Sequence, residues 1–124
     1  MFYLRMVGTS LEFDTLLELC HEQHRRIVLA VLASEKRSLT VSDLTKAIVK
    51  HNHHTPLLEI SEEDVRPIRL SLHHVHIPKL ADLSLVTYDR ERQLVEPTAQ
   101  FDQLQPQLSA VIDADPELEA PVAL

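Results

Sequence analysis

Histidine is the residue type in this chain best suited to chemistry, because its ring binds transition metals and titrates near neutral pH. Six of the eight histidines fall in two short stretches: His51, His53, His54, His73, His74 and His76. The first three are expected in a loop and the other three on one helix. Two hypotheses follow, a metal site and a pH switch.

The spacing gives a metal site little support. His73 and His76, three residues apart, are the pair that can share a helix face, and zinc prefers four ligands. The others would have to come from the loop histidines or from Cys20, and the chain has no Cys-x-x-Cys or His-Glu-x-x-His motif. We therefore predict no metal and no cofactor, with these histidines in the core or solvated.

Enzymatic chemistry lacks its usual motifs. The single glycine, Gly8, excludes a glycine-rich phosphate loop, and no nucleophile elbow or paired-carboxylate motif is present. Cys20 lies in an apolar helical pattern typical of a core residue rather than of a sensor thiol. The sequence therefore predicts a protein that is not an enzyme.

The charge of the chain is concentrated at its ends. The net charge is -7 over 124 residues, with -2 in residues 1–20 and -5 in residues 98–124, so residues 21–97 are neutral. Few lysines beside many acids would suit a salt-rich cytoplasm. No apolar run is long enough to cross a bilayer and the opening residues do not resemble a signal peptide. We expect one cytoplasmic domain with no membrane partner.

Apolar spacing predicts five helices and three short strands. The helices are expected over residues 10–20, 22–34, 42–50, 61–82 and 98–113. The strands are expected over 38–40, 85–88 and 93–96, the last two flanking a charged turn at 89–92. Prolines 67, 78 and 106 should disturb two of the helices, by a kink or delayed start, a bend and a weakened middle.

Several side chains receive specific expectations. Ser10 should cap the first helix, Thr40 or Ser42 the third and Ser61 the fourth. Arg25 and Arg26 should face solvent. The first helix is expected to bury Leu11, Phe13, Leu16, Leu17 and Leu19, and the fourth Val65, Ile68, Leu72, Val75 and Leu80.

The order of elements predicts a mainly α fold with a small antiparallel β-hairpin, arranged as a winged helix-turn-helix. Residues 10–97 would form this domain, after a flexible N-terminal arm at 1–9. A C-terminal helix at 98–114 and a disordered acidic tail at 115–124 would follow.

Two segments resemble the winged-helix regulators of the ArsR type. Residues 38–44, Ser-Leu-Thr-Val-Ser-Asp-Leu, look like the entry into the first helix of that family's motif. Residues 72–88 are similar to the end of its recognition helix and the start of its wing. Within it, the segment His-His-Val-His-Ile-Pro-Lys-Leu resembles, more specifically, a group of haloarchaeal winged-helix domains of undefined function. Ser84 stands where the family has glycine, so it should adopt a positive φ.

The resemblance implies a DNA-binding transcriptional regulator, with double-stranded DNA contacted by the helix at 61–82 and the wing at 85–96. The residues expected to contact DNA are Lys46, Lys50, Arg66, Arg69, His73, Lys79, Arg90 and Arg92. Glu62, Glu63 and Asp64 would repel DNA, so a winged-helix protein–protein interaction module is the alternative. A continuous face of arginine and lysine would favour DNA.

A homodimer is expected, because DNA-binding proteins of this kind commonly act as two-fold symmetric dimers that contact two half-sites of the DNA. Its interface is placed on the C-terminal helix, whose apolar stripe comprises Phe101, Leu104, Leu108, Val111 and Ile112. The alternative is that this stripe closes the core of one subunit.

Overall fold

The computed structural model of the chain describes residues 12–53 and 61–118. Its elements follow one another as α1 (Phe13–Leu19), α2 (Gln23–Glu35), β1 (Leu39–Thr40), α3 (Val41–His53), α4 (Glu62–Ser71), η2 (Leu72–His76), α5 (Ile77–Asp82), β2 (Val86–Asp89), β3 (Leu94–Pro97) and α6 (Ala99–Asp113). The predicted fold class, mainly α with a small antiparallel sheet, is confirmed.

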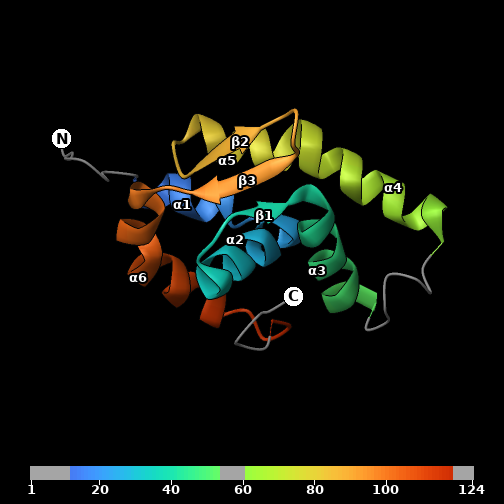
Figure 1. Cartoon of the computed structure of the whole chain (residues 1–124). Coiled ribbons are helices and arrows are strands. Elements are labelled where there is room, and N and C mark those ends of the chain that lie inside the picture. The colour runs from blue at the N-terminus through green and yellow to red at the C-terminus, as the bar shows by residue number, and fades with distance from the viewer. Residues whose placement is uncertain (1–11, 54–60, 119–124) are drawn as a thin grey trace.

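The three strands form one antiparallel sheet in the order β1-β3-β2 (Figure 1). Val95 of the central strand β3 pairs with Leu39 of β1 on one side and with Tyr88 of β2 on the other. The short strand before α3 therefore joins the hairpin, as expected. In Figure 1, α4 projects from one end of the molecule and α6 lies at the other.

Helix α3 begins with a reciprocal cap. The Thr40 hydroxyl accepts a hydrogen bond from the Asp43 backbone N–H at 3.0 Å, and the Asp43 carboxylate accepts one from the Thr40 N–H at 3.1 Å. This capping box fixes the entry into the helix. Helix α3 runs on to His53, so the prediction that His51 and His53 lie in a loop is wrong. His54 lies outside the described residues.

The predicted helix over 61–82 is present but contains the wider π-helical turn η2. The Ile77 N–H donates to the Leu72 carbonyl, five residues back. Pro78 has no N–H to donate in an α-helical pattern. The turn moves the buried position to His76 and Ile77, so the prediction that Val75 is buried is wrong: its side chain is 51% exposed. Helix α4 starts at Glu62 and continues through Pro67, so that proline does not delay its start.

Ser84 makes the turn from α5 into the wing. Its φ is 64°, the left-handed conformation that glycine usually supplies. The Ser84 N–H donates to the Ala81 carbonyl and the Leu85 N–H to the Leu80 carbonyl. These two bonds close a Schellman motif. The expected positive φ at this position is confirmed.

Helix α1 begins later than expected, at Phe13, with Glu12 as its N-cap residue. Ser10 and Leu11 lie outside the described residues. Leu16 and Leu19 are buried, whereas Phe13 is 62% and Leu17 44% exposed. The prediction that all of these apolar side chains are buried is therefore wrong, because so short a helix turns only one stripe toward the bundle.

The prediction that Arg25 and Arg26 face solvent is also wrong. Arg25 is 6% exposed and donates to the carbonyls of Leu19 at 2.7 Å and Glu18 at 3.1 Å. Arg26 donates to the carbonyls of Cys20 and His21 and forms an ion pair with Asp115 at 2.9 Å. Since the last carbonyls of a helix lack helical partners, the two arginines satisfy the end of α1 and the turn into α2.

The stripe on α6 closes the core of the chain itself. Four of the five residues assigned to a dimer interface are buried: Phe101, Leu104, Leu108 and Ile112. Val111 is partly buried and packs against the same core. The assignment of this stripe to a dimer surface is therefore corrected in favour of the alternative. Helix α6 runs through Pro106 to Asp113, from a Thr98 cap whose hydroxyl accepts from the Phe101 N–H.

The segment after α6 is also folded where it is described. Asp115 pairs with Arg26, and Leu118 is 6% exposed. The prediction of a disordered tail is wrong for residues 115–118, while residues 119–124 and the predicted arm at 1–9 fall outside the described part. Within that part, no helix combines the length and apolar character needed to span a membrane.

Candidate nucleic-acid interface

The π turn and the wing are joined by a direct hydrogen bond. His73 Nδ1 lies 2.6 Å from the Tyr88 hydroxyl on β2. The Arg90 guanidinium lies over the Tyr88 ring at 5.4 Å from its centre, a cation–π contact. Burial raises the pKa of Tyr88, and Arg90 opposes that shift. The phenol therefore stays protonated at neutral pH and holds the wing to the helix.

The tip of the wing is ordered by Asp89. Its carboxylate accepts hydrogen bonds from the backbone N–H groups of Glu91 at 3.1 Å and Arg92 at 3.2 Å. This Asx-type turn leads to Gln93, whose φ is 53°. Because the turn is fixed, Arg90 and Arg92 project from a defined tip rather than from a loose loop.

Three of the eight residues expected to contact DNA are engaged by acids of the chain. Arg69 pairs with Glu62 on the same helix. The Lys79 ammonium lies 3.0 Å from the Glu18 carboxylate on α1, and Arg92 lies 3.6 Å from Asp89. All these pairs are partly or largely exposed, so each is a weak and salt-sensitive interaction.

The other basic residues of the set are distributed over α3, α4, η2 and the turn between β2 and β3. Arg66 on α4 is exposed, as are Lys46 and Lys50 on α3. Arg90 is exposed at the wing tip and His73 is partly buried beneath it. The chain therefore brings Arg90 and His73 together through Tyr88, while Lys79 faces α1. Glu62, Glu63 and Asp64 are also exposed, at the start of the same helix as Arg66.

The sequence interpretation missed an exposed apolar pair on the helix formed by α4 and η2. Leu70 is 49% exposed on α4 and Val75 is 51% exposed in η2. Leu70 falls four residues after Arg66, so the two side chains share a helix face. That spacing alone identifies Leu70 as an outward residue, because the buried positions of this helix are Val65, Ile68 and Leu72.

Beneath this surface lies a buried histidine–arginine network. An Arg25 guanidinium nitrogen lies 3.4 Å from His76 Nδ1, which must accept because arginine can only donate. The His24 ring meets the His76 ring edge-on at 6.2 Å, and His24 Nε2 lies 3.0 Å from the Asn52 side-chain nitrogen. Burial lowers the pKa of His76, as do Arg25 and His24, while Glu22 acts in the opposite direction.

The network corrects the expectation that His73 and His76 share a helix face. His73 turns to Tyr88 and His76 to Arg25, on different elements. The π turn between them changes the angle per residue, so a spacing of three no longer brings them together. In the described residues, no three side chains of the histidine, cysteine, aspartate or glutamate type are placed to hold a metal ion.

Cys20 behaves as a core residue, as expected. Its side chain is 4% exposed, and burial raises the pKa of the thiol even though Arg26 and Arg25 lower it. A protonated, covered thiol is a poor nucleophile.

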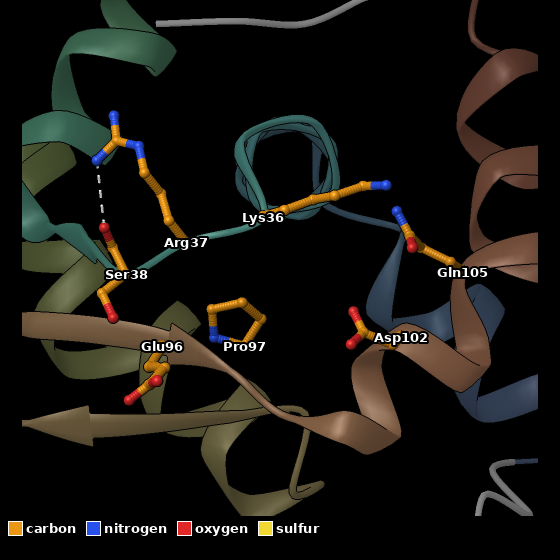
Figure 2. Close-up of a pocket in the computed structure, with 7 residues that line it drawn as sticks. All are labelled: Lys36, Arg37, Ser38, Glu96, Pro97, Asp102 and Gln105. Atoms are coloured by element: carbon orange, nitrogen blue, oxygen red, sulfur yellow. Dashed lines mark hydrogen bonds between the residues drawn. The ribbon is translucent and has the colours of Figure 1, made fainter.

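A polar pocket of about 280 Å³ lies between the loop after α2, the end of β3 and the start of α6. Figure 2 shows its lining: Lys36, Arg37, Ser38, Glu96, Pro97, Asp102 and Gln105. The lining carries two cations, Lys36 and Arg37, and two carboxylates, Glu96 and Asp102, so its formal charges offset one another. It has no clear preference for a ligand of either sign.

Comparison with known proteins identifies a family but no function. The sequence model of DUF7344, a domain of unknown function, matches residues 17–96. The chain belongs to the DUF7344 family. No curated protein and no solved structure matches the chain. The DUF7344 match contains both the wing and the helix that faces it, and it ends before α6.

Proposed function

We propose that this DUF7344 protein is a non-enzymatic, winged-helix regulator that binds double-stranded DNA through α4–η2 and the β2–β3 wing. The observation that carries the proposal is the His73–Tyr88–Arg90 contact, which holds the wing tip against the helix. A helix for the major groove and a wing for the neighbouring backbone are the two parts that winged-helix readers use. A homodimer in the cytoplasm is part of the same proposal, through a surface other than the α6 stripe.

Ion pairs within the chain affect the expected strength and salt dependence of DNA binding. Arg69, Lys79 and Arg92 are held by carboxylates within the chain. A phosphate must displace those carboxylates, so fewer counterions are released per contact than for free cations. We expect weak binding with a shallow dependence on salt, and Arg66 and Arg90 as the strongest contributors.

A mobility-shift series over several salt concentrations tests the proposal. Arg66→Ala and Arg90→Ala should each weaken binding by about fivefold to a hundredfold, the cost of about 1–3 kcal/mol for one arginine contact. Arg37→Ala is the matched control, since Arg37 is exposed beside the α6 pocket and away from α4. Unchanged DNA affinity in both variants would contradict the proposal that α4–η2 and the wing contact DNA.

A protein–protein interaction module is the second candidate, favoured by the exposure of Leu70 and Val75. Exposed apolar residues beside charges of both signs are typical of protein-binding surfaces. Under this candidate, DNA binding is absent at every salt concentration. A cross-linked partner would then be lost on Leu70→Ala or Val75→Ala and kept on Phe13→Ala, an equally apolar change on α1.

A further inference from the structure

A second pocket, of about 400 Å³, opens where α2 begins and α3 ends. The described residues that line it are Gln23, His51, Asn52 and Glu117. Gln23 is the first residue of α2, His51 and Asn52 belong to the last turn of α3, and Glu117 follows α6. The volume lies in the range of pockets that take small molecules. The proposed DNA surface uses none of these four residues.

One atom of this lining has an unmet hydrogen-bonding requirement. Among the described residues, His51 Nε2 is buried and makes no hydrogen bond. Native structures seldom leave a buried polar atom unpaired, so such an atom calls for an explanation. The His51 ring lines the pocket, but its Nε2 atom is covered, so a bound molecule can supply the missing partner only when the ring turns toward it.

The four lining groups share the ability to accept hydrogen bonds. The Glu117 carboxylate accepts only, and the His51 ring accepts at Nε2 in the tautomer that carries its proton on Nδ1. The side-chain nitrogen of Asn52 faces His24, which leaves its oxygen for a ligand, and Gln23 brings a second amide. An acceptor-rich pocket with one carboxylate suits a molecule with several N–H donors and a positive charge.

Among the described lining residues, Glu117 is the one with a formal negative charge. Asp115, two residues before it, is paired with Arg26 at 2.9 Å. The Glu117 backbone N–H donates to the Asp115 carboxylate, the leading cause that lowers the pKa of Asp115. The Arg26–Asp115 pair is neutral as a whole, so it does not offset the Glu117 carboxylate.

Contacts lead from the pocket to the recognition helix. Asn52 lies against His24, the His24 ring meets the His76 ring, and His76 is the last residue of η2. His76 also contacts Arg25, which caps α1. A ligand that forms a hydrogen bond with the Asn52 amide alters the hydrogen bond between Asn52 and His24. The His24 ring in turn packs against His76 of the π turn.

We propose that this pocket binds a small organic cation, an ammonium or guanidinium compound with several N–H donors, and that occupancy is transmitted through Asn52, His24 and His76 to η2. Binding does not depend on DNA recognition. Only its consequence for α4 rests on the proposed function.

Calorimetric titration of the full chain with agmatine and with putrescine tests the site. Either compound should bind saturably with one equivalent, while succinate, a dianion of similar length, should not. Glu117→Gln removes the charge at constant size and should weaken binding by about tenfold or more, as for a lost charge-assisted hydrogen bond. Glu96→Gln, the same change in the other pocket, should leave binding unaltered.

Three results would overturn the proposal: no binding of either amine, equal binding by the Glu117→Gln variant, or saturable zinc binding in place of the amines. Circular dichroism of the variants checks that they fold. Absence of DNA binding leaves this titration unaffected, so the two proposals can fail separately.

Imidazole signals in NMR spectra test the transmission. Agmatine should shift the ring resonances of His24 and His76, and leave the exposed His74 ring, in the same stretch of helix, unchanged. Saturable binding that moves neither His24 nor His76 would refute the path to η2.

Discussion

Arg25 illustrates how residue type and residue position can give opposite predictions. An arginine is usually exposed to solvent. Arg25, however, precedes Val28 by three residues and Leu29 by four, which places it on the buried face of α2. The helical spacing therefore indicated its burial, and the two carbonyls at the end of α1 explain why a charge is accepted there. A sequence pattern identifies the face, but not the distant carbonyls that make a buried arginine stable.

Replacing Arg25 with methionine should destabilise the protein. The apolar stem is kept, while the hydrogen bonds to the carbonyls of Leu19 and Glu18 are lost. We expect the free energy of unfolding to fall by about 2–3 kcal/mol, since bonds from a charged donor contribute about 1.5–3 kcal/mol each and are not additive. Urea denaturation measures the change. Arg37→Met, on an exposed arginine, should have an effect within about 0.5 kcal/mol.

His76 should make stability depend on pH. Its pKa is lowered in the folded chain, so the unfolded chain binds the proton more readily. Stability is complete above the unfolded pKa of about 6.5 and declines as the pH falls below it, until the lowered folded pKa is reached. Urea unfolding from about pH 7.5 to about pH 5 should show this decline, and His76→Asn should flatten it. His74→Asn, at an exposed histidine, should keep the wild-type slope.

At the scale of elements, the helix over 61–82 and the hairpin could be read from the sequence, and the contact between them could not. Apolar spacing and a charged turn are local signals. The π turn depends on the packing of His76 against Arg25 and His24, far away in sequence, and Pro78 is its only local sign. The same holds for the site: the basic residues were identified, but their partners Glu62, Glu18 and Asp89 depend on the folded chain.

The coupling between wing and helix can be broken by Tyr88→Phe. The variant keeps the ring beneath Arg90 and loses the hydrogen bond to His73. Global stability should fall by about 1 kcal/mol, the usual contribution of one such bond. Hydrogen exchange should show faster exchange of the amides of β2 and η2. Thr87→Val, on the neighbouring exposed residue of β2, should leave those amides unchanged; equal acceleration in both variants would contradict a specific coupling.

At the scale of the molecule, α6 is a structural part of a single core. Phe101→Ala should lower the free energy of unfolding by about 3–5 kcal/mol, as for other buried phenylalanines. Its oligomeric state, measured by light scattering under conditions where the variant is folded, should match that of the unaltered chain. A change in association without loss of stability would restore α6 as an interface.

The acidic surface should make the protein more stable in salt. The net charge of -7 repels itself, and salt screens that repulsion over a Debye length that shrinks from about 10 Å at 0.1 M to about 3 Å at 1 M. The melting temperature should therefore rise with KCl at about pH 8. Near the isoelectric point of about 5.5 the same salt series should have a smaller effect, which separates charge screening from general salting-out.

The π turn also sets the rotation of α4 about its axis relative to the wing. If Leu72–His76 were α-helical, one residue fewer would fill the turn, and α4 would rotate by about 100° about its axis relative to the wing. The exposed positions of Arg66 and Leu70 would then pass to their neighbours. The π turn, held through His76 against Arg25 and His24, thus determines which side chains of α4 are exposed to solvent.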